Sequence, residues 1–272
     1  MSLLRSLLYP RPRLSQQRLH ASYAGRWVVV TGATSGIGYA LTHELIDAGA
    51  NLLLIARRED ILKQLCQEAH QHGCEATYRV LDLRDRPSLE ALSQELRSLS
   101  HLDTIFYCAG KSIHRTLLDA QDRLHDFDRT MDVNYRPLVA LSLAVLPLFR
   151  ASQQGRIVYA SSVSTLYPPV PEWSAYHASK TAANVWCRTA DAEWRRLGIR
   201  VQVAYLPLVH TPMSDATASY RKLPAYTASE AAQLLLRLNM SHSSSYRPWW
   251  AWITAPLARL FSPLIPHLYR PL

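Results

Sequence analysis

Hydrophobic and polar positions follow two alternating patterns along most of the chain. Short apolar runs rich in branched residues predict buried β-strands. These runs cover residues 28–31, 51–56, 75–81, 104–108, 156–160 and 200–206. Between the earlier runs, apolar residues recur at helical spacing over 36–48, 61–72 and 87–99. Strands that alternate with helices predict an α/β fold with a single Rossmann-type domain, in which helices cover both faces of a doubly wound parallel sheet.

No internal repeat or low-complexity linker divides the chain of 272 residues, which is long enough to bury a sizeable core. We expect one domain over residues 25–240. A basic N-terminal arm at 1–24 is expected to precede it, and an apolar, basic C-terminal tail at 241–272 to follow it.

The formal net charge of +9 lies entirely in the two ends of the chain. No Asp or Glu occurs before Glu44 or after Glu230. The arginines of these ends are Arg5, Arg11, Arg13, Arg18, Arg26, Arg237, Arg247, Arg259 and Arg270. Because the body between them is neutral, nucleic acid is not an expected partner. The basic ends instead predict contact with something anionic, either a membrane surface or an acyl carrier.

The tail from Trp249 to Leu272 is apolar and aromatic, but prolines interrupt it. They are Pro256, Pro263, Pro266 and Pro271. The segments between them are too short to span a bilayer. The tail fits either an interfacial segment that lies on a membrane or a segment packed on the domain or on a neighbouring subunit.

Cysteine usage and the N-terminus favour a cytoplasmic protein, with peripheral membrane contact through the tail. The four cysteines form no C-x-x-C pair, and the first residues lack the continuous apolar core of a secretory signal. The same Leu-, Ser- and Arg-rich start also has the composition of an organelle transit peptide, so that alternative stays open. No metal site is expected, because His70 and His72 lack a convergent set of other ligands.

A glycine-rich turn links the first strand to the first helix. Its glycines let the backbone approach a pyrophosphate, and the helix N-terminus offers free N–H groups. The expected cofactor-binding residues of this turn are Gly32, Thr34, Ser35, Gly36, Ile37 and Gly38. Arg57 and Arg58 follow the second strand, where a carboxylate would bind ribose hydroxyls. Two guanidinium groups fit a 2′-phosphate instead, so NADPH is preferred over NADH.

Candidate acid–base chemistry lies further along the chain. Tyr176 and Lys180 are four residues apart and would share one face of a helix. A phenol titrates near pKa ~10 and a nearby cation lowers that pKa, so Lys180 is expected to tune Tyr176. Ser162 ends a strand at the carboxyl edge of the sheet, where such folds bind ligands.

Taken in order, these elements resemble the short-chain dehydrogenase/reductase family over residues 25–211. The turn at 31–38 matches its T-G-x-x-x-G-x-G motif and Tyr176 with Lys180 its Y-x-x-x-K motif. The resemblance implies catalytic roles for Asn134, Ser162, Tyr176 and Lys180. Ser162 is chosen over Ser161 because the aliphatic Val163 follows it. The resemblance adds to the expected cofactor site Asp82, Leu83, Ala109, Gly110, Tyr176 and Lys180.

The family's mechanism assigns a role to each of these residues. NADPH delivers hydride to a carbonyl carbon while Tyr176 donates a proton to the oxygen, which Ser162 polarises. Lys180 holds the nicotinamide ribose and lowers the tyrosine pKa, and Asn134 anchors a water chain. The resemblance also implies a homodimer or homotetramer, formed through helices that include the one bearing Lys180.

Two departures from the family pattern carry information. Cys108 replaces the usual Asn of the N-A-G turn, so a bracing hydrogen bond is expected to be lost. Pro207-Leu208 replaces Pro-Gly, and the stretch P-L-V-x-T-P-M resembles the bacterial fatty acyl-CoA reductase branch. By analogy, Pro207, Val209 and Thr211 complete the cofactor site. A substrate lid is expected at about 212–228.

We therefore expect an NADPH-dependent oxidoreductase that transfers hydride to the carbonyl of a lipid-like small molecule. Reduction of a long-chain acyl thioester to an aldehyde is the favoured reaction. Reduction of a ketone or 3-ketolipid is the alternative. A non-catalytic nucleotide-binding regulator is the least favoured reading, because the catalytic residues are intact.

Overall fold

The computed structural model describes residues 3–264, and within them seven strands form one parallel sheet in the order β3-β2-β1-β4-β5-β6-β7. The strands are β1 Trp27–Thr31, β2 Asn51–Ala56, β3 Ala76–Val80, β4 Thr104–Tyr107, β5 Gly155–Ser162, β6 Ile199–Leu206 and β7 Ser245–Tyr246. Every apolar run expected to be a strand is one, and the doubly wound Rossmann-type sheet is confirmed. The order reverses between β1 and β4, which opens a crevice at the carboxyl edge of the sheet.

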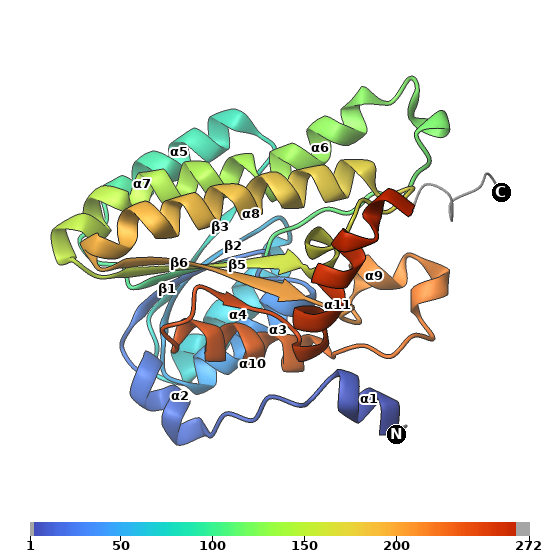
Figure 1. The fold of residues 1–272 in the computed structure, drawn as a ribbon. Coiled ribbons are helices and arrows are strands. Elements are labelled where there is room, and N and C mark those ends of the chain that lie inside the picture. Colours follow the sequence, from blue (N-terminus) through green and yellow to red (C-terminus); the bar gives the residue numbers. More distant parts are fainter. Residues whose placement is uncertain (1–2, 265–272) are drawn as a thin grey trace.

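Helices cover both faces of the sheet (Figure 1). On one face lie α2 Gln16–Tyr23, α3 Gly36–Asp47, α4 Glu59–Gln71 and α10 Ala228–Asn239. On the other lie α5 Arg86–Arg97, α6 Leu124–Asn134, α7 Arg136–Ser152 and α8 Ser174–Trp194. The short helices α1 Leu3–Leu8 and α9 Pro212–Asp215 and the C-terminal α11 Trp249–Leu260 complete the fold.

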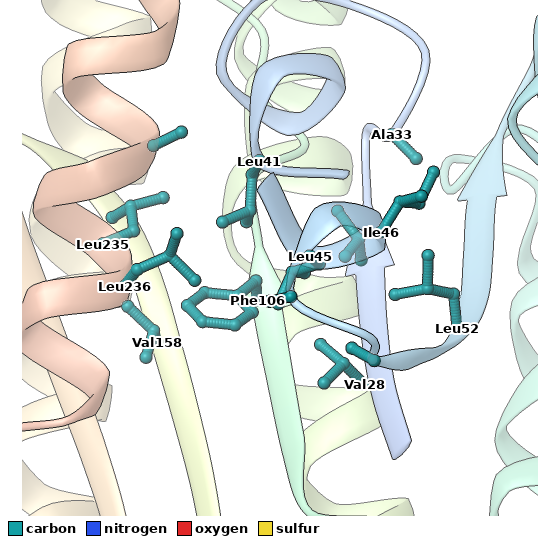
Figure 2. Close-up of a cluster of buried hydrophobic side chains, with 14 of the residues drawn as sticks. Val28, Ala33, Leu41, Leu45, Ile46, Leu52, Phe106, Val158, Leu235 and Leu236 are labelled. Carbon is teal, nitrogen blue, oxygen red and sulfur yellow. The ribbon is translucent and has the colours of Figure 1, made fainter. Parts of the chain in front are cut away.

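Each face of the sheet has its own hydrophobic core. On the first face, Leu45 of α3 and Leu235 of α10 pack with Phe106 and Val158 of the central strands (Figure 2). On the second face, Tyr159 lies in a cluster with residues of α7 and α8. Because neighbouring residues of β5 point to opposite faces and both faces are covered, the centre of the strand, residues 157–160, is apolar and buried throughout.

The two ends of the chain share these cores, which do not stop at the boundaries expected at residues 24 and 240. Leu19 and Tyr23 of α2 are buried in the first core, and the Tyr23 hydroxyl donates to Asn239 Oδ1 at 2.7 Å. At the other end, β7 extends the sheet beside β6. The described parts of the arm and the tail, residues 3–24 and 241–264, are therefore packed on the same body.

Some of the N-terminal positive charge is paired within the protein. Arg5 lies 2.7 Å and Arg11 3.3 Å from the carboxylate of Glu230, and Arg26 lies 2.8 Å from Asp103. The anionic groups that these three arginines contact are therefore carboxylates of the protein itself.

The C-terminal tail differs from expectation at Pro256, which does not interrupt it. Pro256 lies inside α11, on its exposed side, where the carbonyl that loses its N–H partner can bond to water. Pro263 lies in the short 3-10 turn Ser262–Leu264 after the helix, while Pro266 and Pro271 lie outside the described residues. None of the helices within residues 3–264 combines the length and hydropathy needed to cross a bilayer.

Candidate active site

A cleft of about 1400 Å³ opens at the carboxyl edge of the sheet. It is lined by the residue at or just after the end of each strand from β1 to β6, namely Gly32, Ala56, Leu81, Cys108, Ser162 and Leu206. Every residue expected in the cofactor site lines this cleft except Gly38, and so do Ser162, Tyr176 and Lys180. The fold thus brings together side chains that lie up to 179 positions apart between Gly32 and Thr211.

The turn after β1 is built by close backbone packing. A Cβ at Gly38 would lie 2.3 Å from the Gly32 carbonyl oxygen, so only glycine lets α3 begin this close to the strand. Gly38 therefore shapes the turn through packing and does not itself line the cleft. The N-cap residue Ser35 makes no side-chain capping bond, which leaves N–H groups of the first turn of α3 directed at the cleft.

Positive charge collects where β2 and β3 end. Arg58 donates hydrogen bonds to the Thr34 carbonyl and, at 3.4 Å, to Thr34 Oγ1, which ties it to the glycine turn. The Arg57 guanidinium lies 3.9 Å from Asp82 and is mostly exposed. Arg84, which belongs to no sequence motif named above, also lines the cleft and lies 2.6 Å from Asp82. Its hydrogen bonds hold the pKa of the Asp82 carboxyl below the usual value.

The turn after β4 keeps its shape without the usual asparagine. The backbone N–H of Ala109 donates to Thr31 Oγ1 at 3.1 Å, which joins the ends of β1 and β4. Burial raises the pKa of the Cys108 thiol to about 12, against the opposing charge of Lys180. Cys108 is therefore a neutral packing residue at neutral pH. A Cβ at Gly110 would lie 3.5 Å from Asn134 Oδ1 and 3.7 Å from Lys180 Nζ, which places Gly110 between them.

Asn134, the last residue of α6, clamps two segments together. Its Nδ2 donates to the Lys111 carbonyl oxygen and to Ser179 Oγ, both at 2.9 Å, and its Oδ1 accepts from the Lys111 N–H at 2.8 Å. The side chain is fully buried and is not among the described residues that line the cleft. Asn134 thus positions the loop after β4 against α8.

Tyr176 and Ser162 face each other across the floor of the cleft. Burial raises the pKa of the Tyr176 phenol, and a hydrogen bond with Ser162 opposes that shift. Ser162 Oγ also lies 2.8 Å from Ser164 Oγ. Ser161, the alternative serine, has a buried Oγ without a hydrogen-bond partner among the described residues. The geometry therefore places Ser162, and not Ser161, beside the phenol.

Lys180 lies beneath the cleft, one helical turn after Tyr176. Its Nζ donates to the Ala160 carbonyl oxygen at 2.8 Å and lies 4.6 Å from the ring centroid of Tyr159. Burial lowers the pKa of Lys180 to about 8. The expected lowering of the Tyr176 pKa by Lys180 is not seen as a net effect, because desolvation of the phenolate dominates and raises that pKa.

An aromatic wall, which no sequence motif predicts, covers one side of Tyr176. Trp173 stacks on Tyr220 with ring centroids 5.8 Å apart and planes 8° from parallel. The same indole meets the Tyr176 ring edge-on at 5.9 Å and the His114 ring at 4.7 Å. These rings come from three segments that are separate in the sequence, so the wall forms only when the chain folds. The sequence signal was the isolated Trp173 just before the catalytic helix.

The expected lid divides into two parts. Residues between Pro212 and Leu223 line the cleft, and Thr211 caps α9 through a reciprocal pair of bonds with Ser214. Tyr226 is instead fully buried and pairs with Val209 in a β-bridge. The cleft-lining segment is therefore anchored at both ends by the body.

Comparison with known proteins identifies the family. The family model described as short chain dehydrogenase matches residues 26–222. The chain belongs to the short-chain dehydrogenase family. It is an oxidoreductase, as the resemblance implied.

Individual relatives narrow the comparison. The chain is 37% identical over 213 residues to a fatty acyl-CoA reductase of Acinetobacter baylyi, with 78% of this chain and 72% of the relative covered. It is 33% identical over 231 residues to a fatty acyl-CoA reductase of Mycobacterium tuberculosis, with 85% and 77% covered. A similar solved structure comes from Beutenbergia cavernae and is described as an NAD(P)-dependent gluconate 5-dehydrogenase with bound NADP at low occupancy. It superposes on this chain with a TM-score of 0.72 at 27% sequence identity. The superposition covers 79% of this chain and 90% of the other.

Proposed function

We propose that this short-chain dehydrogenase reduces long-chain acyl thioesters to aldehydes with NADPH. The relatives from Acinetobacter baylyi and Mycobacterium tuberculosis are both named fatty acyl-CoA reductases. The observation in this molecule that carries the proposal is the aromatic wall of Trp173 and Tyr220, with Met213 nearby in the cleft lining. Apolar walls beside a small set of polar groups suit an acyl chain whose carbonyl must be oriented.

The cofactor is NADPH, and the residues of the cleft fit it. The structural relative from Beutenbergia cavernae holds NADP. In this chain, the free N–H groups at the start of α3 and the unpartnered Oγ of Ser161 offer hydrogen bonds inside the cleft. The turn from Gly32 to Ile37 would hold the pyrophosphate. Arg57 and Arg58 would hold the 2′-phosphate.

Ser162 and Tyr176 would act together on the thioester oxygen. When bound, NADPH supplies the hydride that turns the thioester carbonyl into an aldehyde as the thiol leaves. Ser162 donates a hydrogen bond to the carbonyl oxygen and so orients it. Tyr176 supplies a proton, and its raised pKa keeps the phenol protonated at neutral pH, which suits the reductive direction.

The remaining residues would hold this pair in place. Lys180 keeps a positive charge at neutral pH because its pKa is about 8, and it would hold the nicotinamide ribose. Asn134 fixes the loop at Lys111 against α8 and acts as a positioning residue. Trp173 shields the phenol from water on one side.

The test is a set of long-chain acyl-CoAs and matched long-chain ketones, each supplied with NADPH. Reduction of a thioester to an aldehyde releases one thiol for each NADPH oxidised, so the two signals should rise together. Oxidation of NADPH by ketones alone, with no thiol released from any acyl-CoA, would replace the proposal with the ketone reductase alternative.

A further inference from the structure

The C-terminal helix α11 turns its large apolar side chains to solvent, whereas an ordinary surface helix turns them to the core. The side packed on the domain carries Ala251 and Ala255, both buried in the second core. The side turned to solvent carries Trp249, Trp252, Ile253, Leu257 and Leu260, with Phe261 just beyond the helix. Trp252 is 60% and Leu260 71% exposed. A helix that served only the core would bury these large side chains.

The exposed side of α11 is continuous along the helix. Its apolar residues follow the three- and four-residue spacing of a single helical face. The one charged residue of α11 is Arg259, which lies between Leu257 and Leu260 in the sequence and donates a hydrogen bond to the Leu166 carbonyl oxygen. We call the apolar residues Trp249, Trp252, Ile253, Leu257 and Leu260, with Phe261, the α11 face.

The N-terminal helix α1 fixes one end of this face. The indole N–H of Trp249 donates to the Leu7 carbonyl oxygen at 2.8 Å, and that of Trp250 to the Leu8 carbonyl oxygen at 3.0 Å. The Leu7 side chain is 59% exposed and adds to the apolar surface. Helices α1 and α11 are therefore joined by hydrogen bonds and form one continuous apolar surface.

Arg247 and Arg259 lie beside the α11 face, and the elements that hold this face carry no carboxylate of their own. Arg247 lies 4.7 Å from the ring centroid of Trp252 and 5.3 Å from that of Tyr205. Burial raises the pKa of Tyr205, and the positive charges of Arg188, Arg247 and Arg259 oppose that shift. Within the described residues, neither α1, nor the 3-10 turn Val163–Leu166, nor the chain after Glu230 contains Asp or Glu.

This combination of charge and shape favours one occupant. In a symmetric dimer formed through the α11 face, the arginines of both copies would approach each other with no carboxylate between them, which is unfavourable. An anionic lipid surface offers the acyl region that Trp, Ile and Leu require and phosphates for the arginines. We propose that the α11 face is a docking surface for an anionic lipid bilayer.

Docking there would bring the bilayer to the side of the cleft. The Arg259 Nε donates to the Leu166 carbonyl oxygen at 2.9 Å, and Tyr167 pairs with Thr254 of α11. Residues Val163–Leu166 directly follow Ser162, so α11 rests on the turn that holds this serine. Figure 1 shows α11 near the carboxyl ends of β5 and β6. Delivery of an acyl substrate from the bilayer rests on the proposed function, whereas docking itself does not.

Sedimentation of the full chain with vesicles tests the proposal without any substrate. The chain should bind vesicles of phosphatidylcholine with about one third phosphatidylglycerol, and bind pure phosphatidylcholine several-fold more weakly. The double variant W252E/L257E should weaken binding to the anionic vesicles by at least about tenfold. The control V80E introduces a single negative charge at a position that is 46% exposed on β3, at the opposite edge of the sheet, and should bind as the native chain does.

Several outcomes would overturn the proposal. They are failure of the native chain to bind anionic vesicles, retained binding in W252E/L257E, and an equal loss in V80E. A native dimer that W252E/L257E dissociates, measured by light scattering, would assign the face to a second copy. Turnover of a soluble short-chain acyl-CoA should be the same in native chain and double variant, so loss of docking and failure of the proposed function are separate results.

A second measurement does not depend on the double variant folding. Brominated lipids quench indoles that enter the bilayer, so they should quench part of the tryptophan emission of the native chain. The conservative variant W252F should keep binding and lose part of that quenching. Unquenched emission in vesicle-bound native chain would contradict docking through the α11 face.

Discussion

The two halves of the cleft are built in different ways. The cofactor half, at the ends of β1 and β2, is shaped by backbone packing around Gly38 and by the charges of Arg57 and Arg58. The substrate half is shaped by the rings of Trp173 and Tyr220, which come from separate loops. The first half needs particular residues in two short turns, each directly after a strand, whereas the second needs bulky side chains that meet through folding. The first should therefore be specific in its chemistry and the second adaptable in its shape.

Replacing Tyr176, which lies between the cofactor half and the substrate half of the cleft, should have the largest effect on turnover. Tyr176→Phe removes the proposed proton donor, so kcat should fall roughly 10³-fold while the affinity for NADPH, measured by fluorescence titration, stays unchanged. Tyr167→Phe is the matched control, because its hydroxyl contacts Thr254 and lies outside the cleft. Turnover within a few-fold of the native rate in Tyr176→Phe would show that another group donates the proton.

The cofactor half should respond next most strongly. In the double variant R57Q/R58Q the 2′-phosphate loses two charged partners, and KM for NADPH should rise roughly 10- to 100-fold. KM for NADH should stay the same, because NADH lacks that phosphate. The control R97Q removes an exposed charge of α5 that lies outside the cleft lining. An equal loss for both dinucleotides would mean that the arginines shape the turn and do not read the phosphate.

The pH dependence reports on Lys180, which lies below both halves. Burial lowers its pKa to about 8, so its charge is present below that pH and is lost as the pH rises through it. If the charge holds the cofactor, kcat/KM for NADPH should fall by about tenfold between pH 7 and pH 9. Lys180→Arg keeps the charge across that range and should remove the inflection, even if its absolute rate is lower. A profile that stays flat in the native chain would contradict this role.

The substrate half should show the smallest and most selective effect. Trp173→Ala should raise KM for long-chain acyl thioesters about fivefold and leave KM for NADPH unchanged. Because Trp173 stacks on Tyr220, a double-mutant cycle with Tyr220→Ala should show a coupling of about 1 kcal/mol in transition-state stabilisation. Additive effects of the two substitutions would mean that the rings act on the substrate independently.

Much of this molecule follows from patterns of a few residues. A run such as 51–56 predicted β2 at its observed bounds, because a strand covered on both faces must be apolar throughout. The glycine turn and the pair Tyr176 and Lys180 were also predictable, since each requires residues within one helical turn or one tight bend. Neither the packing role of Gly38 nor the clamp made by Asn134 could be predicted in the same way.

What the sequence by itself determined is the order of strands and helices along the chain, the glycine turn, the basic end of β2 and the placement of Tyr176 and Lys180 on one helix, α8. Only the tertiary structure decided that Arg84 joins the cofactor edge, that Trp173 meets Tyr220, and that α11 turns its large side chains to solvent. The physical reason is the distance along the sequence between the residues that decide each feature. Local motifs state backbone requirements between near neighbours, whereas the direction of an apolar face depends on which distant segment packs against it.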